Sequence, residues 1–156
     1  MSESAALQRT IQREISLEGV GLHSGEKVRV TFKPAPPAHG IQFVRVDLPG
    51  RPSVKAGLET VVDLEKRPRR TSIGKGQAEV QTIEHVMASL SALGIDNVTV
   101  DIDGVELPGL DGSAVGFVEV LKRAGIQIQD RPRRLFRIRE PIWIAEGGGD
   151  AGGTSR

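Results

Sequence analysis

The chain has 156 residues, the usual size of one domain, and a chain of this length buries roughly 70% of its unfolded surface. Lys and Arg total 21 against 20 for Asp and Glu, which argues against a dedicated nucleic-acid binder, because phosphate contacts need a basic excess. There is no cysteine, which excludes disulfides, thiol nucleophiles and cysteine-based zinc sites. Residues 1–9 do not resemble a signal peptide, and no apolar run reaches the ~18 residues of a membrane span. We therefore expect a cytoplasmic protein without a transmembrane segment.

The first third of the sequence predicts β-strands. Apolar and polar residues alternate over residues 27–33, which is typical of a strand with one solvated face. One further strand is expected from Ile11 and residues 15–20, and another over 41–46. The proline-rich run 34–40 predicts a loop, because proline cannot donate to a strand ladder.

The middle of the sequence predicts the clearest helix, over residues 82–93. Its apolar side chains recur at the spacing of one buried helix face: Ile83, Val86, Met87, Leu90 and Leu93. Thr82 is expected to cap the helix and Gly94 to end it.

A strand and a second helix are expected next. Residues 98–102 alternate as a strand, and residues 114–124 follow the helical pattern. Either Ser113 or Asp111 is expected to cap this helix, and Gly125 to end it.

The composition changes near Asp130, which suggests a domain boundary. We expect a first domain over residues 1–130 and a linker at 131–134. Strands are expected between Leu135 and Ile144, so that 131–145 would open a second, truncated domain. The glycine-rich residues 146–156 predict a flexible tail.

Glu84 and His85 are the most informative polar pair. A helical count places His85 opposite the apolar stripe, beside Ala88, Ser89 and Ala92. The helix dipole at this end disfavours imidazolium, and neutral imidazole is the form that binds a metal. The adjacent carboxylate could then act as a base for a metal-bound water. An ordinary surface pair is the alternative.

Other polar segments leave two readings open. His23 lies in the glycine-rich turn 19–25, where it either faces a ligand or is simply exposed. Asp111 either only caps the following helix or caps it and contacts a ligand as well.

The acidic run from Asp101 to Asp111 is interpreted as a solvated sheet face and loop. The basic clusters around Arg70 and Arg133 either bind the phosphates of a nucleotide sugar or are solvated loops.

Five segments together resemble one known family. Their order and spacing resemble those of UDP-3-O-acyl-N-acetylglucosamine deacetylases, a family that acts in lipid A synthesis. The five segments are Gly19–Gly25, Arg70–Ile73, Thr82–His85, Gly94–Val98 and Glu106–Ala114. The resemblance covers about residues 8–145 and only the N-terminal part of the family's length.

The resemblance implies an α+β fold, a two-layer sheet-and-helix domain like the family's first domain, followed by the opening strands of the second. The family's active site lies between its two domains and uses Zn²⁺ held by two histidines and one aspartate. Only one of these ligands, at His85, matches this chain.

The resemblance also implies site roles and partners. Glu84 matches the general base, and His23, Thr71 and Asp111 are expected to bind the UDP-sugar lipid precursor. A second-domain polypeptide or a full-length enzyme would complete the site, so the isolated chain is expected to be inactive. The alternative function is a non-catalytic binding or regulatory module that keeps the family fold.

Overall fold

The centre of the fold is a five-stranded mixed sheet, in a computed structural model that describes residues 6–63, 65, 68–135 and 138–143. In spatial order its strands are β2 (Ile15–Val20), β3 (Lys27–Pro34), β8 (Val98–Ile102), β4 (Ile41–Arg45) and β5 (Ser53–Lys55). Neighbouring strands are antiparallel except β4 and β8, which run parallel. The strands predicted over 15–20, 27–33, 41–46 and 98–102 are confirmed.

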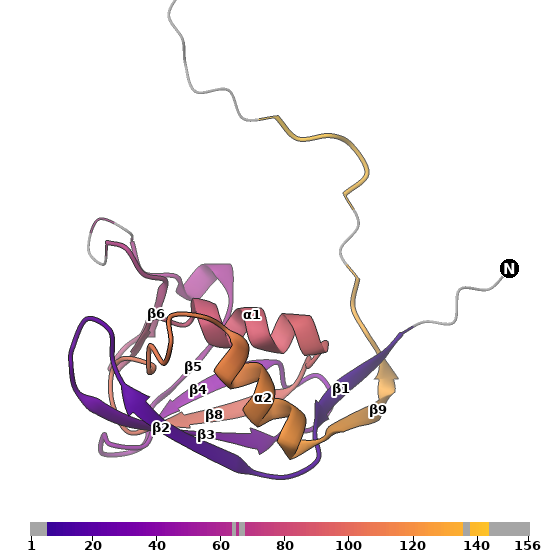
Figure 1. Cartoon of the computed structure of the whole chain (residues 1–156). Helices are drawn as coiled ribbons and strands as arrows, with labels where there is room; N and C mark the ends of the chain where they lie inside the picture. Colours follow the sequence, from indigo (N-terminus) through magenta and orange to yellow (C-terminus); the bar gives the residue numbers. More distant parts are fainter. Residues whose placement is uncertain (1–5, 64, 66–67, 136–137, 144–156) are drawn as a thin grey trace, which may run out of the picture.

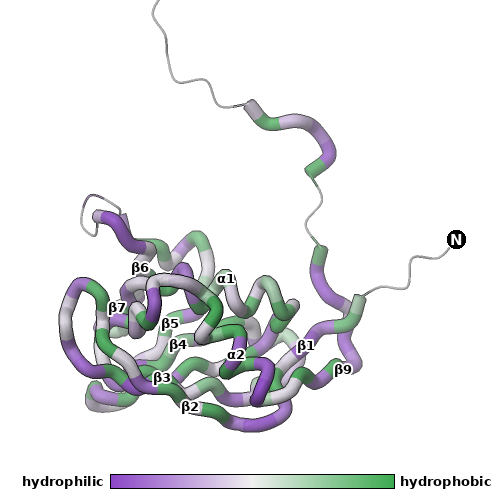
Figure 2. The backbone as a smooth tube through the Cα atoms, in the orientation of Figure 1, coloured by the Kyte–Doolittle hydropathy of each residue, from purple (hydrophilic) through white to green (hydrophobic). Residues whose placement is uncertain are grey.

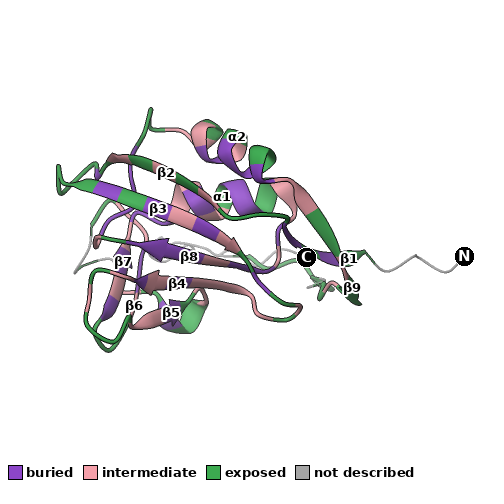
Figure 3. Cartoon of the chain, turned by 90° about the horizontal axis from the view of Figure 1, so that it is seen from below, coloured by how far each residue is buried: buried purple, intermediate pink, exposed green. Residues whose placement is uncertain are grey.

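The sheet has one apolar face and one polar face. Along β3, Val28, Val30 and Phe32 are buried, whereas Lys27 and Arg29 are exposed. Figure 2 shows the same alternation of hydropathy along the strands, and Figure 3 shows the alternating burial along β3 from below. The alternation arises because successive side chains of a strand point to opposite faces.

Two helices cover the apolar face, which confirms the predicted two-layer α+β fold (Figure 1). They are α1 (Glu84–Leu93) and α2 (Val115–Ala124). Phe117 of α2 is fully buried and meets Phe32 edge to face, with ring centroids 6.5 Å apart. Gly94 ends α1 in the left-handed conformation that favours glycine, as predicted, and α2 ends at Gly125.

A short hairpin extends the core beside α1. It consists of β6 (Ser72–Lys75) and β7 (Ala78–Gln81), preceded by the 3₁₀ turn η1 (Leu58–Thr60). Val61 forms an isolated bridge with Ile73. No helix in the described part of the chain is long and apolar enough to cross a membrane.

The two ends of the described core form their own antiparallel ribbon. β1 (Leu7–Ile11) pairs with β9 (Ile126–Pro132). The predicted linker at 131–134 is therefore wrong at its start, because β9 continues to Pro132. Arg133 then donates its N–H to the carbonyl of Ala6 at 2.7 Å, and its guanidinium pairs with Asp96 at 2.8 Å.

The strands predicted between residues 135 and 144 are absent from the described part of that segment. Leu135, Ile138, Ile142 and Trp143 belong to no strand and are 65–87% exposed. The prediction failed because β-prone residues need a neighbouring strand to pair with, and the described residues provide none here. Phe136, Ile144 and the predicted tail 146–156 lie outside the described residues.

Candidate active site

The chain enters α1 through a conformationally strained residue. Thr82 has a φ of 59°, a left-handed conformation that a β-branched residue adopts at a cost of about 1–3 kcal/mol. Its hydroxyl donates to Oε1 of Glu106 at 2.9 Å. The helix starts from Ile83 with no side-chain cap. The predicted capping role of Thr82 is wrong, because its hydroxyl is directed at a carboxylate instead of a helix N–H.

Glu84, the predicted base, lies in the first turn of α1 and is half-buried. Its Oε2 accepts the backbone N–H of Thr71 at 3.1 Å. The carbonyl of Thr71 in turn accepts the N–H of Ile83 at 3.2 Å. The structure therefore places Thr71, a predicted substrate contact, directly beside Glu84.

His85, the predicted metal ligand, is also half-buried and is not part of the apolar core. Ala88 and Ala92 on the expected small-residue face are exposed, but Ser89 is fully buried where α1 meets α2. The Ser89 hydroxyl lies 2.7 Å from the carbonyl of His85 and 3.1 Å from that of Ala114. The small-residue face of α1 is therefore only partly open to solvent, because Ser89 lies in the contact with α2.

Asp111 lies within electrostatic reach of His85. The pKa of Asp111 is lowered, mainly by the hydroxyl and N–H of Ser113 and to a smaller extent by the charge of His85. The Ser113 hydroxyl also accepts the N–H of Val115 at 3.1 Å, but α2 starts from Ala114 with no side-chain cap, so neither Ser113 nor Asp111 occupies the predicted cap position. A ligand contact by Asp111 stays a prediction.

His23 lies in the exposed turn between β2 and β3. Its backbone N–H donates to both oxygens of Glu106, at 3.0 and 3.2 Å. The turn is thus fixed by its backbone, while the imidazole side chain remains exposed. That His23 contacts the substrate stays a prediction, because these hydrogen bonds involve only its backbone.

Glu106 is the central residue of this region that the sequence analysis missed. It is only 2% exposed, although the acidic run around it was interpreted as solvated. Burial raises the pKa of Glu106, but hydrogen bonds from Ser24, the N–H of His23 and the Thr82 hydroxyl outweigh burial and lower it. The available signal was its apolar context, between Val105 and Leu107.

The same interpretation fails at Asp101. This residue is 8% exposed and its carboxylate pairs with Lys33 at 2.7 Å and Arg51 at 3.1 Å. The carboxylate is buried because two cations from neighbouring segments cover the polar face of the sheet there.

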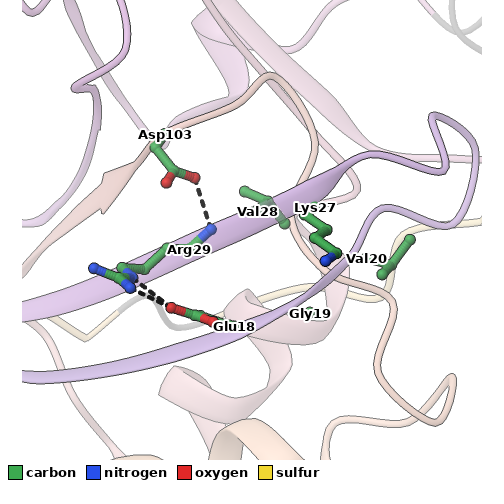
Figure 4. A pocket seen from close by; sticks show the side chains of 7 residues that line it. All are labelled: Glu18, Gly19, Val20, Lys27, Val28, Arg29 and Asp103. Carbon is green, nitrogen blue, oxygen red and sulfur yellow. Dashed lines mark hydrogen bonds and ion pairs between the residues drawn. The ribbon is translucent and has the colours of Figure 1, made fainter.

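An open hollow of about 410 Å³ lies elsewhere, between β2, β3 and Asp103. Figure 4 shows that Glu18 and Arg29 form an ion pair across it, and that the N–H of Arg29 donates to Asp103 at 2.6 Å. None of the five predicted site residues lines this hollow. The candidate site is therefore defined by the residues around the start of α1 and not by this hollow.

The described residues place one imidazole here but no complete set of metal ligands. His85 offers an imidazole, a donor type that zinc accepts, and Asp111 lies nearby. No group of three or more His, Cys, Asp or Glu within the described part of the chain could hold a metal. A metal bound through His85 would need ligands from outside the described residues.

Fold and geometry together define a two-layer α+β domain with a glutamate and a histidine side by side in the first turn of one helix. The sequence profile of the UDP-3-O-acyl N-acetylglycosamine deacetylase family matches residues 8–152. The chain therefore belongs to this family.

Several relatives carry the name UDP-3-O-acyl-N-acetylglucosamine deacetylase. The Myxococcus xanthus protein is 44% identical over 147 residues, covering 94% of this chain and 46% of the relative. Those of Bdellovibrio bacteriovorus and Xanthomonas campestris pv. campestris are each 45% identical and cover 90% of this chain. The match covers 46% of the Bdellovibrio relative and 45% of the Xanthomonas relative. This chain therefore spans slightly less than half the length of each of these proteins.

Proposed function

We propose that this chain supplies one half of the active site of a zinc-dependent deacetylase that removes the N-acetyl group of UDP-3-O-acyl-N-acetylglucosamine in lipid A synthesis. The observation that carries the proposal is the position of Glu84 and His85 in the first turn of α1, with the N–H of Thr71 donating to Glu84. Membership of the deacetylase family supports the reaction class.

Each residue has a defined role in this proposal. His85 would be one zinc ligand, and zinc, when bound, supplies a Lewis acid that polarises an amide carbonyl and acidifies water. Glu84 would take up the proton of the attacking water and later deliver it to the leaving amine. His23, Thr71 and Asp111 would contact the UDP-sugar lipid precursor.

The remaining zinc ligands would come from a second-domain polypeptide or a full-length enzyme. Slightly more than half of each relative's length lies outside the matched region, which is room enough for a second domain. A catalytic zinc site needs three protein ligands held together, so the isolated chain would lack substantial activity. We assign the reaction to the cytoplasm, which is compatible with a cysteine-free chain.

Reconstitution tests this proposal. The chain is incubated with zinc and substrate, alone and with a polypeptide that corresponds to the unmatched C-terminal part of the Myxococcus xanthus relative. We expect acetate release only from the mixture.

Glu84→Gln should reduce turnover in the mixture by about 10²-fold or more, because the amide cannot accept a proton. Its carbonyl can still accept the N–H of Thr71, so folding should be retained.

Glu119→Gln on the exposed surface of α2 is the matched control and should leave turnover unchanged. Robust turnover by the chain alone would contradict the two-part site. Binding of the two polypeptides without any turnover would favour the non-catalytic module.

A further inference from the structure

We infer that Glu106 is a positioning residue that ties the turn carrying His23 to the start of α1, and so fixes His23 relative to Glu84 and His85. This inference rests on the proposed function for its catalytic meaning. The tie itself is defined by contacts that involve neither metal nor substrate.

Glu106 brings together backbone and side-chain donors from distant parts of the chain. Its Oε2 accepts the N–H of Ser24 at 2.7 Å, and its Oε1 accepts the N–H of His23 at 3.0 Å and the hydroxyl of Thr82 at 2.9 Å. In the described part of the chain, its hydrogen-bond partners are all neutral. Glu106 is only 2% exposed, and a buried carboxylate whose described partners are neutral is stabilised only while these donors remain in place.

The turn is shaped to reach this carboxylate. A Cβ on Gly21 would lie 2.6 Å from Oε2 of Glu106 and would also collide with the hydroxyl oxygen of Ser24. The turn is closed by the N–H of Gly25, which donates to the carbonyl of Gly21 at 3.0 Å. The absence of a side chain at position 21 therefore lets the backbone approach Glu106 closely.

The other end of the tie holds the strained residue before α1. Thr82 is followed directly by Ile83, Glu84 and His85, so its conformation sets the direction in which the helix starts. Backbone bonds join the residue before Thr82 to both neighbours of Glu106: the N–H of Gln81 donates to the carbonyl of Val105 at 2.8 Å, and the N–H of Leu107 donates to the carbonyl of Gln81 at 3.1 Å. Strain of this kind persists only where the surroundings hold it, and Glu106 holds the Thr82 side chain.

A carboxylate is required at position 106 because donors face both of its oxygens. A glutamine would turn an NH₂ group toward the backbone N–H of either Ser24 or His23, and two donors would then oppose each other. Glu106→Gln should therefore release one end of the tie while changing the side-chain volume very little.

The tie can be tested on the full chain without substrate. Amide hydrogen exchange and histidine ring NMR signals are compared for wild type, Glu106→Gln, Thr82→Val and Thr82→Ser. We expect Glu106→Gln to accelerate exchange at His23 and Ser24 by about tenfold or more and to shift the ring signals of His23 and His85. Thr82→Ser keeps the hydroxyl and should behave as wild type. Glu119→Gln should change nothing.

The inference is overturned if folded Glu106→Gln leaves these amides and both ring signals unchanged. If Glu106→Gln does not fold, Thr82→Val decides, because it removes one donor and keeps the carboxylate and the β-branched shape. A shift of the His85 signal in Thr82→Val then supports the tie, and an unchanged signal overturns it.

The catalytic meaning is read separately in the reconstituted mixture. There Glu106→Gln should lower kcat by about tenfold with a smaller change in KM, and Thr82→Ser should retain kcat. If the wild-type mixture is inactive, the proposed function fails, while exchange and ring signals still decide the tie. If the mixture is active and Glu106→Gln retains full kcat, the positioning role is wrong and the proposed function stands.

Discussion

The carboxylate of Glu106 should give the protein a measurable sensitivity to acid. Its folded-state pKa is lowered, because the hydrogen bonds from Ser24, His23 and Thr82 outweigh the effect of burial. A group whose pKa is lowered by folding stabilises the protein above its unfolded pKa, about 4.3 for glutamate. That contribution is lost as the pH falls through the lower folded pKa. Wild type should therefore lose stability below about pH 4.5 partly through this residue.

Urea unfolding of wild type and Glu106→Gln between about pH 6 and pH 3 measures this contribution. The difference in unfolding free energy should be largest near pH 6 and should shrink below about pH 4.5. The comparison isolates Glu106 from Asp47, whose pKa is lowered by Arg45 and which titrates equally in both proteins. A difference independent of pH would show that Glu106 does not act as a carboxylate acceptor.

The candidate site illustrates what local sequence determines. Glu84 and His85 could be placed on the first turn of a helix because the apolar spacing of that helix lies within a few residues of them. For Glu106 the local sequence offers only the apolar neighbours Val105 and Leu107 as a signal, because its burial depends on donors 82 and 83 residues away in the chain. The strain at Thr82 has the same origin, since the partner of its hydroxyl is 24 residues away.

Among the elements, the contact between α1 and α2 depends on a small side chain at Ser89. This residue is fully buried, and its hydroxyl bonds to the carbonyls of His85 and Ala114, one on each side of the contact. Ser89→Leu should push the helices apart and destabilise the fold by about 1–3 kcal/mol. Ser89→Ala loses only the hydrogen bonds and should cost about 1 kcal/mol.

Urea denaturation gives both values, and amide exchange in α2 locates the effect. Exchange should accelerate at Phe117 and Leu121 in the leucine variant more than in the alanine variant. Equal destabilisation by the two substitutions would mean that the contact has room for a larger side chain.

The accuracy of the element predictions follows from where each signal originates. Both helices and four strands of the main sheet have their own periodic patterns, and these elements were predicted correctly. β9 was not predicted, because its alternation of apolar and polar residues covers only residues 126–129 before Asp130, Arg131 and Pro132 follow, and its pairing with β1 makes it a strand. Residues 138–143 show the reverse: Ile142 and Trp143 favour a strand, but among the described residues no strand lies alongside them.

For the molecule as a whole, Trp143 reports whether the C-terminal apolar residues are covered. It is the only tryptophan, the chain has no tyrosine, and its side chain is 87% exposed. Its emission should therefore be that of a solvated indole in the native chain and should change little on unfolding in urea. Acrylamide should quench it to a similar extent in both states, while circular dichroism follows unfolding independently.

Addition of a tryptophan-free second-half polypeptide should change this signal if residues 138–143 pack against it. Exposed apolar side chains such as Ile142 and Trp143 commonly mark a surface that a partner covers. In the mixture we expect the emission to shift to shorter wavelength and acrylamide quenching to weaken. The single variant Ile142→Ser should weaken binding without changing the unfolding free energy of the chain alone. A blue-shifted emission that moves to longer wavelength on unfolding of the monomer would contradict the exposed position of Trp143. Binding without any change in emission would place the partner on another surface, with the face of α1 that carries Ala88 and Ala92 as the next to test.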